Sequence, residues 1–267
     1  MSMNKDNAYN MDAYVAEIYD QFETEMDDVA LLRKLLAGRN RLRILEPFFG
    51  TGRIAIPLAQ DGHQVTGIER STYMIERARS KIAELSEETA GRITILEGDV
   101  LVTHWPVGFD LVLLGGNCFY ELGSGDEQER CIALARASLK PDGHVYVDNN
   151  HMEGELDVSW RQPPGMAGKS FPQGTCTDGT QVQGTTEMIW YDVPGRLVRY
   201  RRTVTVTTPD GKVTRREWME QCHPPSKVEV ASWLEKHGFK TEELYGDRLG
   251  NPYTDDSGRA IFWATRE

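Results

Sequence analysis

The stretch Arg43-Ile44-Leu45-Glu46-Pro47-Phe48-Phe49-Gly50-Thr51-Gly52-Arg53 decides how this chain folds. Its short apolar run, which is typical of a buried strand, ends on the carboxylate of Glu46. Gly50 and Gly52 then permit a sharp turn, because glycine adopts a positive φ without steric cost. The apolar residues 54–59 predict the start of a helix. A strand, a glycine turn and a helix N-terminus in this order predict a nucleotide-type cradle at the carboxyl end of a parallel strand.

Strands and helices alternate through the residues that follow this stretch. Periodicity predicts strands over 42–46, 64–69, 92–97, 109–114 and 144–148, and helices over 53–61, 73–85 and 127–139. This spacing is typical of crossover connections in a parallel sheet. Residues 228–237 predict another helix, while 239–245 and 259–265 predict a terminal antiparallel hairpin. We therefore expect an α/β fold with a Rossmann-like, seven-stranded and mostly parallel sheet.

The chain divides into four segments. Residues 1–40 predict two helices, which either cover the mouth of the cradle or only pad the sheet. Residues 41–150 are expected to form the cofactor-binding core, and 224–267 its C-terminal part. Between them, residues 151–223 lack helical periodicity. A long loop is predicted over 161–184, and β-rich runs over 185–192, 196–207 and 212–222 predict an antiparallel insertion.

Composition excludes several classes of function. The 267 residues carry a formal net charge of −11, which disfavours a nucleic-acid partner. No window approaches eighteen uninterrupted apolar residues, so no membrane span is expected. The N-terminus lacks the pattern of a secretion signal, and the four cysteines lack the spacing of a metal site. We expect a cytoplasmic protein without a bound metal, either a monomer or a homodimer.

The glycine turn formally matches a dinucleotide fingerprint, but the carboxylates around it indicate another ligand. Glu46 lies just before the glycines, where it would repel a pyrophosphate and attract an ammonium group. Glu69 ends the next strand, where an acidic side chain can accept both hydroxyls of a ribose. Asp99 follows the third strand and can reach an adenine amine. Together these positions favour a cationic adenosyl ligand.

Four motifs resemble those of the class I S-adenosylmethionine-dependent methyltransferases. Residues 46–53 resemble motif I of that family, and residues 67–74 resemble its acidic ribose motif. Residues 98–100 resemble the adenine-contact motif, and 139–143 the turn before the fifth strand. One departure is Phe48, which stands where motif I usually has its first glycine. The likeness runs from about residue 40 to 150 and resumes at about 224.

The resemblance implies S-adenosylmethionine as cofactor and a role for each matching residue. Gly50 and Gly52 would approach the methionyl part, and Arg53 would meet its carboxylate. Glu69 would hold the ribose. The remaining expected contacts lie around the adenine and at the strand ends: Arg70, Met74, Asp99, Val100, Gly115 and Asn117.

The position of the insertion resembles small-molecule methyltransferases of the glycine N-methyltransferase and amino-sugar N-methyltransferase groups, and this resemblance implies that residues 151–223 form a substrate cap. It also implies methyl transfer to an amine nitrogen, or next to an oxygen, in which positioning supplies most of the rate. Candidates for accepting a proton are His151 and His223, which flank the insertion, and Tyr19 in the N-terminal helices. The open alternatives are an NAD-dependent oxidoreductase, a non-catalytic S-adenosylmethionine-binding protein and a methyltransferase acting on a macromolecule.

Overall fold

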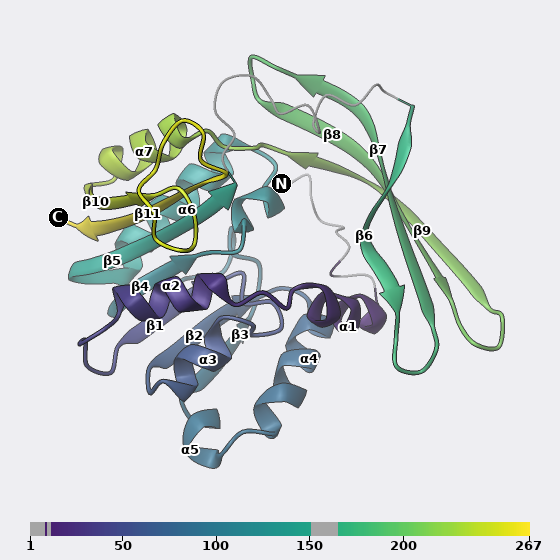
Figure 1. Ribbon diagram of the computed structural model, residues 1–267, viewed down its shortest axis with the longest axis horizontal. Coiled ribbons are helices and arrows are strands. Elements are labelled where there is room, and N and C mark those ends of the chain that lie inside the picture. The colour runs from purple at the N-terminus through teal and green to yellow at the C-terminus, as the bar shows by residue number, and fades with distance from the viewer. Residues whose placement is uncertain (1–8, 10–11, 151–164) are drawn as a thin grey trace.

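The computed structural model describes residue 9, residues 12–150 and residues 165–267, and it contains two separate sheets (Figure 1). The larger sheet has the strand order β10-β11-β5-β4-β1-β2-β3. Only β11 runs antiparallel to its neighbours β5 and β10. Its strands are β1 (Arg43–Pro47), β2 (Gln64–Glu69), β3 (Ile93–Glu97), β4 (Phe109–Leu114), β5 (Leu139–Asn150), β10 (Phe239–Tyr245) and β11 (Arg259–Arg266). The expected seven-stranded Rossmann-like sheet with a terminal hairpin is confirmed.

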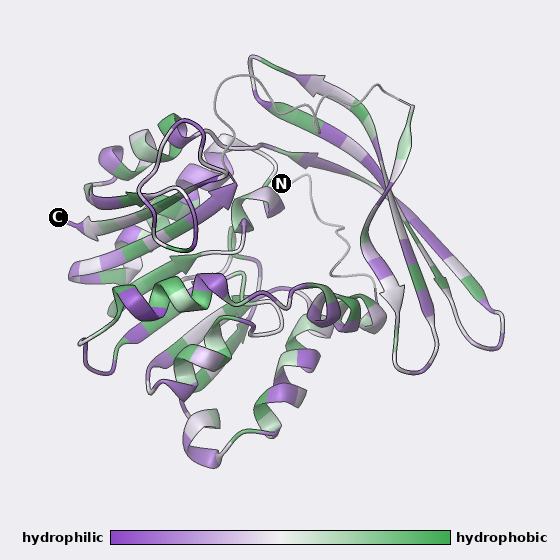
Figure 2. Ribbon diagram, in the orientation of Figure 1, coloured by the Kyte–Doolittle hydropathy of each residue, from purple (hydrophilic) through white to green (hydrophobic). Residues whose placement is uncertain are grey.

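Helices cover both faces of this sheet, so its strands are apolar on both sides (Figure 2). Leu45 and Val112 face a buried cluster with α6 (Gly125–Ser138) and α7 (Lys227–Lys236). Their neighbours Ile44 and Leu111 face the opposite cluster, which contains side chains from α2, α3 and α4. The helices on this side are α2 (Asp27–Leu35), α3 (Ala55–Gln60), α4 (Thr72–Ala83) and the short α5 (Glu87–Ala90).

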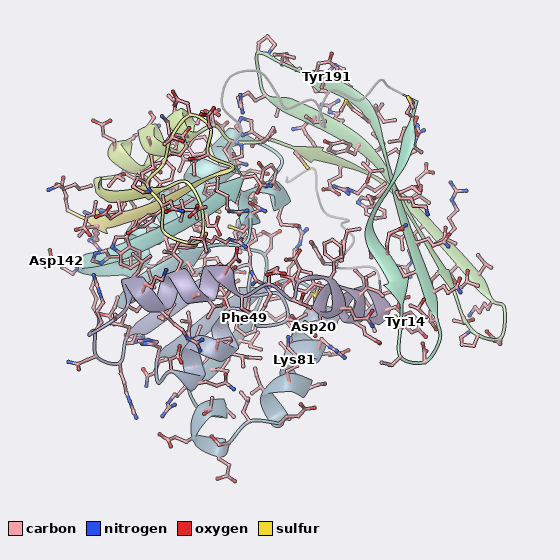
Figure 3. All side chains as sticks on the ribbon, in the orientation of Figure 1. Tyr14, Asp20, Phe49, Lys81, Asp142 and Tyr191 are labelled. Carbon is pink, nitrogen blue, oxygen red and sulfur yellow. The ribbon has the colours of Figure 1, made fainter. Side chains whose placement is uncertain are left out.

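The two N-terminal helices pack in different places, and a role in covering the mouth of the cradle stays a prediction. The buried side chains of α2 pack on the large sheet, as padding. By contrast, α1 (Ala13–Phe22) buries Val15 and Ile18 against the second sheet. Asp20 ties the same helix to the core, because it accepts hydrogen bonds from Thr51, Arg77 and Lys81 (Figure 3). Helix α1 therefore bridges the two sheets.

The insertion is a four-stranded antiparallel sheet in the order β6-β7-β8-β9. The three predicted β-rich runs appear as β7 (Gln181–Asp192), β8 (Leu197–Thr207) and β9 (Val213–Cys222). The prediction of a loop over 161–184 is wrong in part. Strand β6 (Ala167–Thr175) forms within this range and pairs with β7. No helix in the described part of the chain is long and apolar enough to cross a membrane.

The turn after β1 has an unusual backbone. Phe48, Gly50 and Gly52 all adopt left-handed conformations, with φ of 67°, 59° and 77°. Phe48 therefore takes the conformation that favours glycine, at a cost of about 1–3 kcal/mol for a residue with a Cβ. The next side chain, Phe49, lies flat on β2, where a Cβ on Gly67 would come within 2.0 Å of its ring. The turn is thus shaped by two aromatic side chains as well as by two glycines.

Candidate functional site

A cavity of about 350 Å³ opens where the turns after β1, β2 and β4 meet, and we call it the core cavity. Gly52 does not line it. That residue instead shapes the turn, and its amide donates to the Phe49 carbonyl. Every other residue predicted to hold the cofactor lines this cavity: Glu46, Gly50, Arg53, Glu69, Arg70, Met74, Asp99, Val100, Gly115 and Asn117.

Glu46 is the most unusual group in the core cavity. Its side chain is buried, and its Oε2 has no hydrogen-bond partner among the residues that the structure describes. Burial raises the pKa of Glu46 to about 8. A buried carboxylate oxygen without a partner is costly, because its desolvation is not offset. A ligand that brings an ammonium group into the cavity would offset that cost.

Glu69 stands at the end of β2, and the backbone fixes its carboxylate. One oxygen accepts the Gly50 amide at 2.8 Å, and the other accepts the amides of Arg70 and Ser71. Burial nevertheless raises the pKa of this carboxyl above its usual value. The oxygen that accepts the Gly50 amide can accept a further hydrogen bond, because each carboxylate oxygen has two lone pairs. Glu69 is therefore oriented toward the cavity before any ligand binds.

The other side of the core cavity is shaped for a flat apolar group. Met74 and Val100 are buried, and both line the cavity. Ser71 caps α4 and so fixes the turn that carries Met74. Asp99 accepts the Leu101 amide at 2.8 Å, which orients its carboxylate at the cavity wall. Apolar side chains beside one carboxylate suit an aromatic ring with an exocyclic amine.

Three arginines of the cavity wall bind two fully buried carboxylates, and we call these five residues the ionic cluster. Arg53 contacts both oxygens of Asp28. Arg248 and Arg259 donate to Asp148 at 2.9 and 2.7 Å. Both carboxylates are 0% exposed. The guanidinium of Arg53 is thus neutralised by Asp28, so its predicted contact with a cofactor carboxylate stays a prediction.

The sequence reasoning missed Asp28, Arg248 and Arg259. A signal existed for Arg259, because it opens the last strand of a predicted antiparallel hairpin. The start of such a strand lies at the same sheet edge as the carboxyl ends of the parallel strands. No comparable signal marked Arg248, which lies in the link between β10 and β11. Asp28 resembled an ordinary acidic residue in the first turn of a helix.

A second cavity of about 610 Å³ lies between the large sheet and the insertion, and we call it the inter-sheet cavity. It shares part of its wall with the core cavity: Tyr9, Tyr19, Glu23, Gly116, Asn117 and Glu121. The insertion contributes a wall of mixed character: Ser170, Thr186, Met188, Tyr200, Arg202 and Glu220. A molecule in one cavity would therefore lie directly beside a molecule in the other.

The three predicted proton acceptors have different positions. Tyr19 lies on the shared wall, and burial raises its pKa to about 12. His151 lies outside the described residues. His223 lines neither cavity: it is 4% exposed, its Nδ1 lies 2.7 Å from Gln128, and its Nε2 lies 3.2 Å from Glu229. His223 is thus held away from both cavities, and its predicted role as a proton acceptor stays a prediction.

Comparison with known proteins agrees with this geometry. Residues 44–143 match a family described as "Methyltransferase domain". The chain is 25% identical to a putative methyltransferase of Geobacillus sp. strain WCH70, over 84% of each chain. It is 30% identical to glycine N-methyltransferase of Rattus norvegicus, over 51% of this chain and 49% of that protein.

Among solved structures, an amino pentose methyltransferase of Micromonospora echinaspora, described as SAM-bound, has a TM-score of 0.64. It is 19% identical, and the alignment covers 98% of this chain and 99% of that one. At this identity the likeness shows the fold, and the match over residues 44–143 coincides with the turns that form the core cavity. Over residues 44–143 the chain is thus similar to a methyltransferase domain, and its overall fold is that of solved S-adenosylmethionine-dependent methyltransferases.

Proposed function

We propose that the core cavity binds S-adenosylmethionine through the residues described above. Glu46 would hold the ammonium group of the methionyl part, and Glu69 the ribose hydroxyls. Met74 and Val100 would pack on the adenine, with Asp99 beside its amine. The partnerless oxygen of Glu46 is the feature that fits this cofactor better than a dinucleotide. When bound, the cofactor supplies a methyl carbon activated by a sulfonium.

We infer that the acceptor is a small molecule that enters the inter-sheet cavity. The shared wall carries this inference, because it places two adjoining cavities side by side at the turn after β4. Most of the acceleration then comes from alignment, since a displacement at a methyl carbon needs donor and acceptor in line. Helix α1 and the insertion contribute by bounding this cavity and limiting the access of water.

The first expectation for the acceptor atom is an amine nitrogen, with an oxygen next. Glu121 and Glu220 line the inter-sheet cavity, and Glu23 lies on the shared wall. Carboxylates and tyrosine rings together suit a group that enters as an ammonium. The names of two similar proteins, glycine N-methyltransferase and an amino pentose methyltransferase, support the same choice.

Tyr19 remains a candidate for positioning the reactants rather than for accepting a proton. Its ring makes edge contacts with Tyr9 at 5.9 Å and with Phe171 at 6.3 Å between ring centroids. A phenol with a pKa of about 12 stays protonated at neutral pH. It would therefore donate a hydrogen bond or present its ring to a cation.

A methyl-label transfer screen against fractionated metabolites tests this function. We expect label in a small amine-containing product and micromolar-range or tighter binding of S-adenosylmethionine by calorimetry. Glu69→Ala serves as the control that lacks the ribose contact. Label in an oxygen-methylated product would revise the acceptor atom. Label found only in macromolecules would overturn the small-molecule acceptor.

A further inference from the structure

Glu121 is one of the ionisable residues on the wall that the two cavities share, and it is not among the predicted site residues. Glu121 ends the short 3-10 helix η2 (Cys118–Glu121), which follows β4. Its side chain is half-buried and lines both cavities. The helix is held in place, because the Gly115 carbonyl accepts the Cys118 amide and Asn117 is bonded to β5 and Arg259. The position of Glu121 is therefore set by the large sheet.

Charged groups face Glu121 from the insertion, from the turn after β2 and from the N-terminal segment. From the insertion, Glu220 and Arg202 act on it, and these two residues form an ion pair at 2.7 Å. Arg70 and Glu69 act on it from the turn after β2. The charge of Glu121 in turn helps to raise the pKa of the Tyr9 hydroxyl, after the larger effect of burial. Two arginines and two other carboxylates therefore act on Glu121, and an entering ammonium group would add a further positive charge beside it.

We propose that Glu121 accepts the proton of the acceptor's ammonium group before methyl transfer. The proposal rests on the proposed function, namely on an amine acceptor in the inter-sheet cavity. Glu121 has the position that this role requires, because it faces the acceptor's cavity and the cofactor's cavity together. His223 lacks that position, and the phenolate of Tyr19 forms only in strongly alkaline solution, because burial raises the pKa of Tyr19 to about 12.

The step balances as follows. The ammonium group gives one proton to the Glu121 carboxylate and becomes a neutral amine with a free electron pair. That pair forms the new nitrogen–carbon bond, the carbon–sulfur bond breaks, and its electron pair stays on sulfur. The product leaves as a methylated ammonium, and the Glu121 carboxyl returns its proton to solvent.

The chemistry of the site is consistent with this role. Burial, followed by the charge of Glu220, raises the pKa of Glu121 to about 7. The carboxylate form, which accepts the proton, therefore dominates above neutral pH. A base whose pKa lies near the working pH is the most effective, because it combines the correct protonation state with a useful driving force.

The test compares Glu121→Gln with wild type on the amine that gives the highest label transfer. We expect kcat/KM to fall about 100-fold at pH 7 and to recover to within about tenfold of wild type one pH unit above the amine's own pKa, where solvent deprotonates the amine. The wild-type profile should rise through about pH 7. That inflection should be absent in Glu121→Gln and retained in Glu121→Asp.

Glu217→Gln is the matched control, since Glu217 is exposed on the insertion and lines neither described cavity. Binding of S-adenosylmethionine, measured by calorimetry, should stay within about threefold of wild type in Glu121→Gln, which separates proton transfer from loss of the fold. An unchanged rate and pH profile in that variant would overturn the role of Glu121 alone. No transfer to any amine by the wild-type protein would overturn the proposed function as well.

Discussion

The core cavity and the inter-sheet cavity adjoin, but they are built differently. Backbone amides and short turns at the strand ends hold the groups of the core cavity, such as Glu69 and Asp99. The inter-sheet cavity takes its wall from the insertion, from α1 and from the turn after β4. Its polar groups are held mainly by other side chains, as Arg202 is by Glu220 and Thr186. Under the proposed function, the cofactor would contact groups that the backbone fixes, and the acceptor would contact side chains that are held by other side chains.

The largest expected effect tests whether the ionic cluster supports the core cavity. Arg259→Ala leaves the buried Asp148 with only Arg248 as a cationic partner among the residues of the cluster. We expect the free energy of unfolding to fall by about 3 kcal/mol, because a buried carboxylate that loses a partner is strongly destabilising. Urea denaturation measures this. Arg41→Ala is the control, since its ion pair with Glu88 is exposed and is expected to contribute less than about 1 kcal/mol.

The second largest expected effect is a loss of cofactor affinity on changing Glu69, which lines the core cavity and not the inter-sheet cavity. In Glu69→Ala the cofactor loses its ribose acceptor, and the amides of Gly50, Arg70 and Ser71 lose a common partner. We expect binding of S-adenosylmethionine to weaken on the order of 100-fold, as hydrogen bonds to a charged group are worth about 1.5–3 kcal/mol. Isothermal calorimetry gives the affinity. An affinity equal to that of wild type would falsify the assignment of the ribose site.

Glu46 provides a pH-dependent test of the core cavity. Its pKa is raised to about 8 in the folded chain, above the usual value of 4.5. The unfolded chain therefore releases this proton first, so Glu46 lowers the stability of the ligand-free protein as pH rises from about 4.5 to about 8. Glu46→Gln should remove this loss, which urea denaturation at the two ends of the window can measure.

The same variant also tests the ammonium contact. We expect Glu46→Gln to bind S-adenosylmethionine about tenfold more weakly, because the amide carries no charge. At pH 7 wild type should release a proton on binding, as the ammonium favours the ionised carboxylate. Calorimetry in buffers with different ionisation enthalpies would detect the proton. Equal proton release by both proteins would place the ammonium elsewhere.

The smallest effect concerns the wall between the cavities. Tyr19→Phe keeps the ring that contacts Tyr9 and Phe171 and removes only the hydroxyl. We expect kcat to fall by about threefold and the pH profile to keep its shape, since one hydrogen bond contributes about 1 kcal/mol. Initial-rate measurements across pH would show it. A profile that lost an inflection would instead assign proton transfer to Tyr19.

The sheet and much of the cofactor site were predictable from sequence, because both depend on local patterns. Apolar runs, glycine turns and a capping box at Ser226 placed most strands and helices to within a few residues. By contrast, β6 contains Gly, Pro, Thr and Gln, and only pairing with β7 makes it a strand. The ends of β5 also extend beyond the prediction, through the turn residues 141–143.

The sequence could not show the contacts that depend on tertiary structure. The pairing of Arg248 and Arg259 with Asp148 joins residues far apart in the chain, and no spacing rule describes it. The large sheet fixes Glu121, but the second cavity beside it exists only because of where the insertion lies. Phe48 could be predicted only in part. Its departure from the usual glycine was visible, but the structure shows that the residue adopts the glycine-like backbone and that its ring lines the core cavity.

The ionic cluster also has a consequence for the order in which the protein folds. The contact of Arg259 with Asp148 spans 111 positions, and that of Arg248 with Asp148 spans 100. Contacts between such distant residues form slowly, because the loop between them must first close. Strands β1 and β2, which are close in sequence, can pair much earlier. A partly folded chain would then contain the glycine turn but not a complete cofactor cavity, so cofactor binding would stabilise only molecules that have finished folding.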